Sequence, residues 1–401
     1  MKASNANKVI SVLLSVAMCP MMVPSAAFAA EDDAASDASS PSGQKQPADQ
    51  AEGVDAGASL NGTITPQSEA AGASTDEAAP VTKANGEGAQ APTAEEGAET
   101  AVAEVGGKSY SSLQAAIDAA KERAVVKLLA NTKENVTIST KNVTLDLNGY
   151  TLNGSTGERK PALTVTSRAY VMDSSAAQTG TIMREDTAEN SGVSSHYVID
   201  VQGGKSGWLF FQSGTVKNDS GAGGTKGASL VRVGDDSKPG LPHMTITGGT
   251  FTQDNFIVLK CDSGILSVAG GTINSANSYA IQNWKKTYIK DGDKGASRPV
   301  INGNVSTWTY NGSGSSLEIS GGTVNGNVES VTYDGVEGEP AKVSITGGTV
   351  NGTLNTVDYS TGTTSNDPTK ATVEVTGGTF NTDPSRYVVE NFAATKNADG
   401  M

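Results

Sequence analysis

The chain contains few of the residues that build disulfide frameworks, metal sites and nucleophilic active sites. It has two cysteines and two histidines in 401 residues. Cys19 lies in an apolar N-terminal segment, which leaves Cys261 alone in the rest of the chain. One thiol excludes an intramolecular disulfide framework, and a lone cysteine beside an alternating apolar stretch is typical of a small buried residue. The composition indicates no cofactor.

Long hydrophobic runs and basic patches are also missing. The apolar run at residues 9–18 is far shorter than the ~20 residues needed to span a bilayer, so we expect no transmembrane segment. The net charge is −14; residues 1–29 contribute +2 and residues 30–103 contribute −12, which leaves −4 for residues 104–401. A nearly neutral body without a basic stripe predicts that nucleic acid is not a partner.

The first 29 residues have the pattern of a signal peptide. Lys2 and Lys8 precede the apolar run, and the letters AFA at 27–29 supply the small-x-small site that a signal peptidase cuts. Residues 1–29 are therefore predicted to direct export. The protein is expected to be secreted or displayed at the cell surface.

Residues 30–103 form an acidic segment rich in Ala, Glu, Gly, Ser and Pro. It contains fourteen acids, two lysines and hardly any large apolar side chain. Such a composition buries too little surface to offset the entropy of ordering. We therefore predict a disordered linker that is extended by its own charge repulsion.

Both ends of the remaining chain carry segments suited to covering an open strand edge. Residues 104–130 are predicted to form a capping helix followed by a first strand, AVVKLL. One helical face is shared by Leu113, Ala116, Ile117 and Ala120. Residues 384–401 contain a short helical stretch and an Asp-Gly turn signal, which predicts a C-terminal cap or the start of an incomplete motif.

Between these ends one pattern recurs at uneven intervals. The clearest copies are MTITGGTFTQ at 244, LSVAGGTINS at 266, LEISGGTVNG at 317, VSITGGTVNG at 343 and VEVTGGTFNT at 373. Positions one and three are apolar and position two is polar, which predicts a strand with one face inward. Position eight is apolar again, although a straight strand would turn it to the opposite face. The chain must therefore bend at positions five and six.

Positions five and six are glycine in every close copy. These corner glycines are Gly248, Gly249, Gly270, Gly271, Gly321, Gly322, Gly347, Gly348, Gly377 and Gly378. Glycine pairs permit positive φ or a bulge, and they let the backbone of the next layer approach closely. Position nine is Asn in four copies, so a stacked amide ladder is expected from Asn274, Asn325, Asn351 and Asn381.

Weaker copies extend the series toward the N-terminus and predict a solenoid. The position-seven threonines fall at 151, 181, 215, 250, 272, 323, 349 and 379, and PVINGNV at 299 is a degenerate copy in the long gap. The mean spacing is about 28 residues, and such a repeat cannot bury enough surface to be stable alone. We predict an all-β protein in which residues 131–383 form a right-handed parallel β-helix with variable loops.

These residues carry a resemblance to a known group of proteins. The stretches KSYSSLQAAIDAA, KNVTLDLNGYTLNG and GGTFNTDPSRYVVENFAATKNADG, with the xIxGGTVNG units between them, are the basis. They resemble exported surface proteins of Gram-positive gut bacteria that carry a pectate-lyase-like β-helix. The resemblance covers residues 104–401 and implies an adhesin-like bacterial surface protein, but it does not fix an activity.

Catalysis on such a fold would require a carboxylate pair or a metal-assisted base. The best carboxylate pair is Asp235 and Asp236, with His243 nearby, but the surrounding residues also suit a surface turn. Asp291 and Asp293 in DGDKG suggest a Ca²⁺ loop, yet the further acids of such loops are missing, which favours a turn. The polygalacturonase motifs Gly-His-Gly and Arg-Ile-Lys are absent.

Aromatic side chains near turns are the candidates for sugar binding without cleavage. They are Trp208, Trp284, Trp308 and Tyr310. The alternative for each is a stacked core or outer-face ladder. We expect a monomeric, non-catalytic scaffold that contacts glycans or host or bacterial surface proteins. A polysaccharide-active enzyme, either a lyase or a glycoside hydrolase, and a purely structural stalk are the alternatives.

Overall fold

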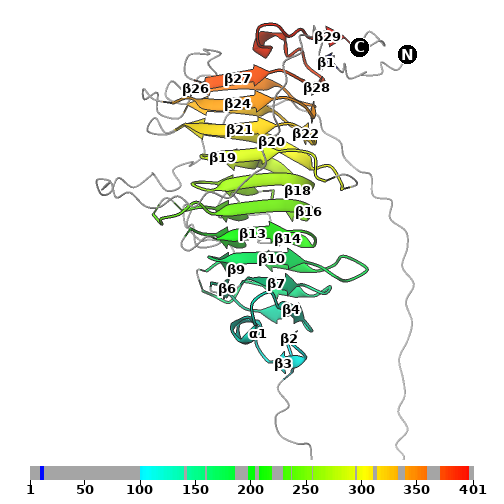
Figure 1. Cartoon of the computed structure of the whole chain (residues 1–401), viewed down its shortest axis with the longest axis vertical. Coiled ribbons are helices and arrows are strands. Elements are labelled where there is room, and N and C mark those ends of the chain that lie inside the picture. Colours follow the sequence, from blue (N-terminus) through cyan, green and yellow to red (C-terminus); the bar gives the residue numbers. More distant parts are fainter. Residues whose placement is uncertain are drawn as a thin grey trace, which may run out of the picture. The chain divides into compact units, whose positions relative to one another are not determined.

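The protein is built from parallel strands that stack in sequence order from β4 to β28 (Figure 1). The computed structural model describes residues 10–12 and 100–396, apart from 140–141, 159, 186–196, 204–206, 219–228, 236, 255, 294–295, 310–313, 333–338 and 359–370. Each strand pairs in parallel with the corresponding strand of the preceding and following repeat, so three columns of strands result. The predicted all-β class and repeating parallel sheet are confirmed.

The three columns share this pairing rule and differ in their place in the repeat. The first column is β4 (Val125–Leu128), β7 (Val143–Asp146), β10 (Arg168–Met172), β13 (Trp208–Phe211), β16 (His243–Thr252), β18 (Ile265–Asn283), β19 (Lys286–Ile289), β21 (Ser315–Ile319), β24 (Ala341–Ile345) and β27 (Ala371–Val375). The second column is β5 (Thr132–Lys133), β8 (Thr151–Asn153), β11 (Thr181–Arg184), β14 (Thr215–Asn218), later parts of β16 and β18, then β20 (Val300–Thr309), β22 (Thr323–Asn325), β25 (Thr349–Val350) and β28 (Gly378–Phe380). The third column is β6 (Val136–Ile138), β9 (Leu163–Val165), β12 (Ile199–Val201), β15 (Val231–Val233), β17 (Leu259–Cys261), the ends of β18 and β20, then β23 (Val328–Thr332) and β26 (Leu354–Asp358).

Side chains that point inward from all three columns form one continuous hydrophobic core. In the copy at 244, Met244, Ile246 and Phe251 are all fully buried, as positions one, three and eight of the repeat predict. The same three positions are buried in the other four close copies. Cys261 is buried in this core too, and burial raises the pKa of its thiol to about 12.

The two glycines of each corner have different tasks. Gly249 adopts φ +84°, a left-handed conformation that favours glycine. Gly248 instead allows a close approach, because a Cβ at this position would lie 2.2 Å from the carbonyl oxygen of Gln212 in the preceding layer. The pairing of β16 with β18 shifts register on either side of Thr247, so the predicted bend is a local irregularity within a continuous strand.

The outward side of the second column carries the threonines and asparagines of the repeat. All eight position-seven threonines pair in one register, with Val300 filling the long gap between Thr272 and Thr323. The predicted amide ladder is confirmed and includes Asn302 from the degenerate copy. Side-chain bonds of 2.7–2.8 Å link Asn274, Asn302, Asn325 and Asn351 in series. Asn381 ends the series by donating to the backbone of Asn351.

Repeats near the N-terminus lack the glycine pair and use buried aspartates at the same corner. Asp173 accepts hydrogen bonds from the backbone N–H groups of Gly149 (2.8 Å) and Gly180 (2.6 Å). Asp146 accepts from Asn148 and Ser174 (both 3.0 Å). Burial would raise the pKa of Asp173, but the hydrogen bonds that Asp173 accepts outweigh burial and lower this pKa. The sequence pattern did not predict this substitution of a side-chain acceptor for a glycine corner.

The N-terminal end is covered by a hairpin and a short helix. β2 (Ala103–Val105) pairs antiparallel with β3 (Lys108–Tyr110) and with β4, and α1 (Leu113–Ala119) follows. α1 buries Leu113, Ala116 and Ile117, which confirms the predicted apolar face. Glu134 accepts hydrogen bonds from the N–H groups of Leu113 (2.9 Å) and Gln114 (3.1 Å), so it satisfies backbone donors at the start of the helix.

At the other end, η2 (Ser385–Tyr387) and β29 (Thr395–Lys396) follow β28. β1 (Ile10–Val12) pairs antiparallel with β28 and β29. The rest of the predicted signal peptide and residues 30–99 of the predicted linker lie outside the described residues. Within the described part, no helix is long and apolar enough to cross a bilayer.

Candidate functional site

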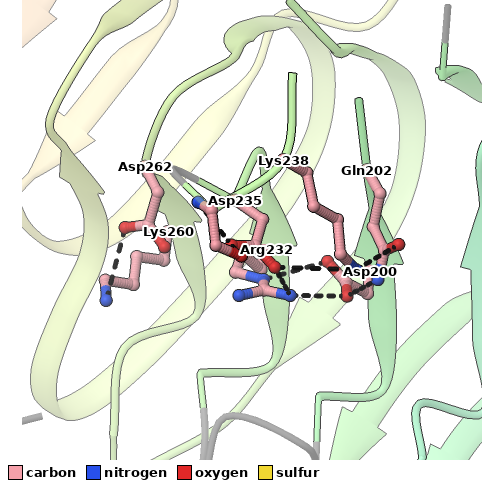
Figure 2. Close-up of polar contacts among 8 residues, drawn as sticks. Asp200, Gln202, Arg232, Asp235, Lys238, Lys260 and Asp262 are labelled. Carbon is pink, nitrogen blue, oxygen red and sulfur yellow. Dashed lines mark hydrogen bonds and ion pairs between the residues drawn. The ribbon is translucent and has the colours of Figure 1, made fainter. Parts of the chain in front are cut away.

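The first candidate catalytic residue, Asp235, belongs to a network of ion pairs beside the third column (Figure 2). The network centres on Arg232 of β15, which points outward and donates to Asp200 of β12 through Nε (3.0 Å) and Nη2 (2.8 Å). Only 11% of the Arg232 side chain and 2% of the Asp200 side chain are exposed. Burial acts to lower the pKa of Arg232, but the hydrogen bonds and charge of Asp200 outweigh it and raise that pKa.

Asp235 is held in this network from several directions. Arg232 Nη2 lies 3.1 Å and Lys238 Nζ 3.6 Å from its Oδ2, and the backbone N–H of Ser237 donates to Oδ1 (3.0 Å). Burial would raise the pKa of Asp235, but the Ser237 hydrogen bonds and the Arg232 charge lower it. An ionised carboxylate already bonded to two cations is a poor proton donor and a weak base. Asp236 lies outside the described residues.

His243 is not brought to Asp235. It begins β16 in the first column, where its ring packs against Trp208 with 4.8 Å between the ring centres. Burial lowers the pKa of this imidazole, so His243 is neutral at pH 7. The structure therefore does not assemble Asp235 and His243 into an acid–base unit, and the predicted pairing of Asp235 with Asp236 lies outside the described residues.

The candidate Ca²⁺ residues also have structural partners. Asp291 accepts from the backbone N–H of the corner residue Gly322 (2.8 Å) and pairs with Arg298 Nε (3.2 Å). The backbone carbonyl of Asp293 accepts from Ala296 N–H (2.8 Å), which closes a turn. Among the described residues, no cluster of three or more His, Cys, Asp or Glu side chains is arranged to hold a metal ion. The turn interpretation fits Asp291 and Asp293 better than a metal loop does.

Two of the predicted sugar-binding aromatics do come together beside the third column. The rings of Trp284 and Trp308 lie 5.2 Å apart, and Tyr279 meets Trp308 edge-on at 5.9 Å. Trp308 is 4% exposed, whereas Trp284 and Tyr279 are half-buried and remain accessible. Trp284 Nε1 donates to Gln282 (3.1 Å), which fixes the orientation of the indole. Tyr310 lies outside the described residues.

No short-range sequence pattern pointed to Glu329, which completes this aromatic cluster. Tyr279 donates its hydroxyl to Glu329 Oε2 (3.1 Å), and Asn355 Nδ2 lies 3.5 Å from Oε1. Burial raises the pKa of the Glu329 carboxyl, although these two partners act in the opposite direction. No cation pairs with Glu329 in the described part of the chain. Tyr279, Trp284, Trp308 and Glu329 are called the aromatic–acid cluster below.

No family model, curated protein or solved structure matches this chain. A half-buried indole, a phenol, an amide and a carboxyl group grouped on one outer face can stack on a sugar ring and exchange hydrogen bonds with its hydroxyls.

Proposed function

We propose that the protein is an exported, non-catalytic scaffold that contacts glycans at the aromatic–acid cluster. In this proposal the three columns wind as a right-handed parallel β-helix of the adhesin-like type, which the N-terminal sequence pattern sends to the bacterial surface or the medium. The aromatic–acid cluster carries the proposal. It offers an accessible Trp284 face beside polar groups, while Asp235 and Asp291 are occupied by structural bonds.

A binding role is supported by the way the cluster is held. Trp308 contacts both accessible rings, is buried, and is itself fixed by a 2.7 Å hydrogen bond from Nε1 to Ser306 Oγ. A rigid aromatic surface loses little conformational entropy when a ligand binds. Gln282 and Glu329 adjoin this aromatic surface. They lie in register with Ser306, Gln282 in the layer before it and Glu329 in the layer after it.

The test is direct binding of the purified chain to a panel of neutral and acidic oligosaccharides by calorimetry. Trp284→Ala should weaken binding of the best neutral oligosaccharide by at least about tenfold, because truncating an aromatic side chain at the centre of a binding site can remove about 2 kcal/mol. Phe392→Ala, which removes an aromatic side chain that is 37% exposed near the C-terminus, is the control and should bind normally. Absence of binding to every glycan would favour a purely structural stalk.

One observation favours a polysaccharide-active enzyme as the second candidate. Glu329 has a raised pKa beside aromatic rings, a setting that keeps a carboxyl group protonated for general acid catalysis. However, its hydrogen-bond partners are a phenol and an amide, and hydrolysis needs a second carboxyl group across the bond. New reducing or unsaturated ends on incubation with polysaccharides, lost in Glu329→Gln, would establish the enzyme and refute the non-catalytic scaffold.

A further inference from the structure

A second set of aromatic rings lies on the outer side of the first column, whereas the aromatic–acid cluster lies beside the third column. Tyr170 of β10 pairs in register with Phe210 of β13, and Trp208 pairs with His243 of β16. Ring centres are 4.8 Å apart for Tyr170 and Phe210, 5.1 Å for Trp208 and Phe210, and 4.8 Å for Trp208 and His243. These four residues are called the aromatic row.

The aromatic row presents positive rather than neutral chemistry to a ligand. Its rings cover one another's faces, and the guanidinium of Arg168 lies 4.8 Å from the centre of Trp208. What remains for a ligand is the ring edges, which carry the positive part of the aromatic quadrupole. Arg168 is exposed and pairs with no carboxylate among the described residues, and no Asp or Glu occurs in β10, β13 or β16.

Exposed apolar side chains flank the row. Val125 is 50% exposed and lies in register with Thr144 of β7, which in turn lies in register with Tyr170. Leu241, two residues before His243, is 48% exposed. These are two of the three large hydrophobic side chains that are exposed in the described chain. These two side chains are single residues and form no continuous patch, but they add apolar surface near either end of the row.

Two polar atoms on this face lack a hydrogen-bond partner within the described residues. They are Nε1 of Trp208 and Oγ of Ser267, and Ser267 continues the Phe210 register through Thr245. Buried polar groups are normally satisfied, so the unpaired indole N–H of Trp208, the ring that Arg168 covers, indicates a missing acceptor. A ligand hydroxyl could supply this acceptor after a small local rearrangement that uncovers Nε1, whereas Ser267 lies three layers from Arg168.

These observations favour one class of ligand. A second copy of the chain docked through the same three strands would bring Arg168 to β10, β13 and β16, which contain no Asp or Glu, so its charge would stay uncompensated. An acidic peptide could not add as a strand, because β10 and β13 are already paired on both sides. We propose that the aromatic row and Arg168 bind a carboxylated saccharide, with its carboxylate on the guanidinium and its hydroxyls on Trp208 Nε1 and the neighbouring hydroxyl side chains.

Binding is measured on the whole chain with a hyaluronan octasaccharide, its carboxyl-reduced counterpart and a polyglutamate peptide of equal charge. The octasaccharide should bind, and Arg168→Gln should weaken it about tenfold or more through loss of a charge-assisted hydrogen bond. Trp208→Phe keeps a ring in the stack and should weaken binding less. Lys286→Gln is the matched control. Lys286 lies over Tyr288 on the outer side of the first column, as Arg168 lies over Trp208, but Lys286 Nζ is already 3.9 Å from Glu318 Oε1.

Three results would overturn the assignment: unchanged octasaccharide affinity in Arg168→Gln, equal affinity for the carboxyl-reduced sugar, or equal affinity for polyglutamate. Thermal unfolding of each variant shows whether a loss of binding reflects misfolding, which an exposed Arg168→Gln change should not cause. The proposal is independent of the aromatic–acid cluster, since Trp284→Ala should leave octasaccharide binding at the aromatic row intact.

Discussion

At the scale of single residues, Gly249 combines a left-handed backbone with a close approach of the preceding layer. Gly249 has φ +84°, and a Cβ there would lie 2.6 Å from both the Gly214 carbonyl oxygen and the Phe211 ring. Gly249→Ala should therefore lower the free energy of unfolding on the order of 2–4 kcal/mol, from backbone strain and overpacking together. Chemical denaturation of the two proteins measures this difference.

Gly107→Ala separates the two contributions. Gly107 also has a positive φ of 77°, but nothing lies within 4 Å of an added Cβ. Only the backbone cost of about 1–2 kcal/mol should appear there. Equal losses at Gly107 and Gly249 would mean that close packing of the layers at the corner contributes nothing.

Glu134 makes the N-terminal cap sensitive to pH. Burial would raise its pKa, but hydrogen bonds from Thr132 and from the start of α1 outweigh burial and lower it. A lowered folded-state pKa gives stability that is present above the ordinary glutamate pKa and is lost as pH falls through the lowered value. Glu134→Gln should cost about 1 kcal/mol at pH 7, a modest value because the side chain is partly solvated.

The pH dependence of the loss is the discriminating measurement for Glu134. The difference in unfolding free energy between wild type and Glu134→Gln should shrink steadily as pH falls into the acid range, because the wild-type carboxyl then becomes neutral. A difference that stays constant with pH would show that hydrogen-bond geometry, and not the charge, stabilises the cap.

At the scale of elements, the amide ladder ties together the outer edges of consecutive second-column strands. Asn325 donates to Asn302 (2.7 Å) and accepts from Asn351 (2.8 Å), so Asn325→Ala removes two bonds at once. The expected loss is about 1–2 kcal/mol, since each exposed hydrogen bond contributes little net stability. Urea denaturation measures it.

Asn277→Ala is the control for the ladder. Asn277 is an exposed asparagine of β18 and takes no part in the series of amide bonds. Its replacement should change the unfolding midpoint by less than half as much as Asn325→Ala, because surface substitutions typically lie within about 0.5 kcal/mol. Equal effects would mean that the ladder is a consequence of the stacking and does not support it.

At the scale of the whole molecule, each layer pairs its strands only with the layers before and after it, so stability should vary along the stack. β16 and β18 are long strands with paired neighbours on both sides, whereas β28 meets only short segments beyond it. Amide hydrogen exchange should be slowest in β16 and β18 and faster in β27 and β28. Uniform protection along the chain would indicate all-or-none opening instead.

The strands could be predicted because their signal is local and repeated. Met244, Ile246 and Phe251 are separated by a spacing that only an inward strand, a bend and a second inward residue satisfy. The aspartate corners escaped prediction, since Asp173 reaches backbone groups of Gly149 in the preceding layer. No short-range pattern records such a contact.

The candidate sites show the same division. Trp284 and Trp308 were predicted as aromatic candidates near turns. Glu329 could not be predicted to join them, because it lies 50 residues from Tyr279 in sequence and reaches the cluster from the layer after Trp308. Conversely, Asp235 and His243 are close in sequence, yet they lie on different columns because a turn separates β15 from β16. Proximity along the chain therefore misplaced one candidate pair and missed another.

The amino-acid sequence determined the all-β class, the inward and outward positions, the glycine corners and the asparagine series, because each follows from a period of two or from one residue's backbone freedom. Tertiary structure alone decided which outward side chains became neighbours, such as Arg168 with Trp208 and Glu329 with Tyr279. Neighbours across a parallel sheet come from different layers, and the loops between layers vary in length, so their sequence separation follows no fixed rule.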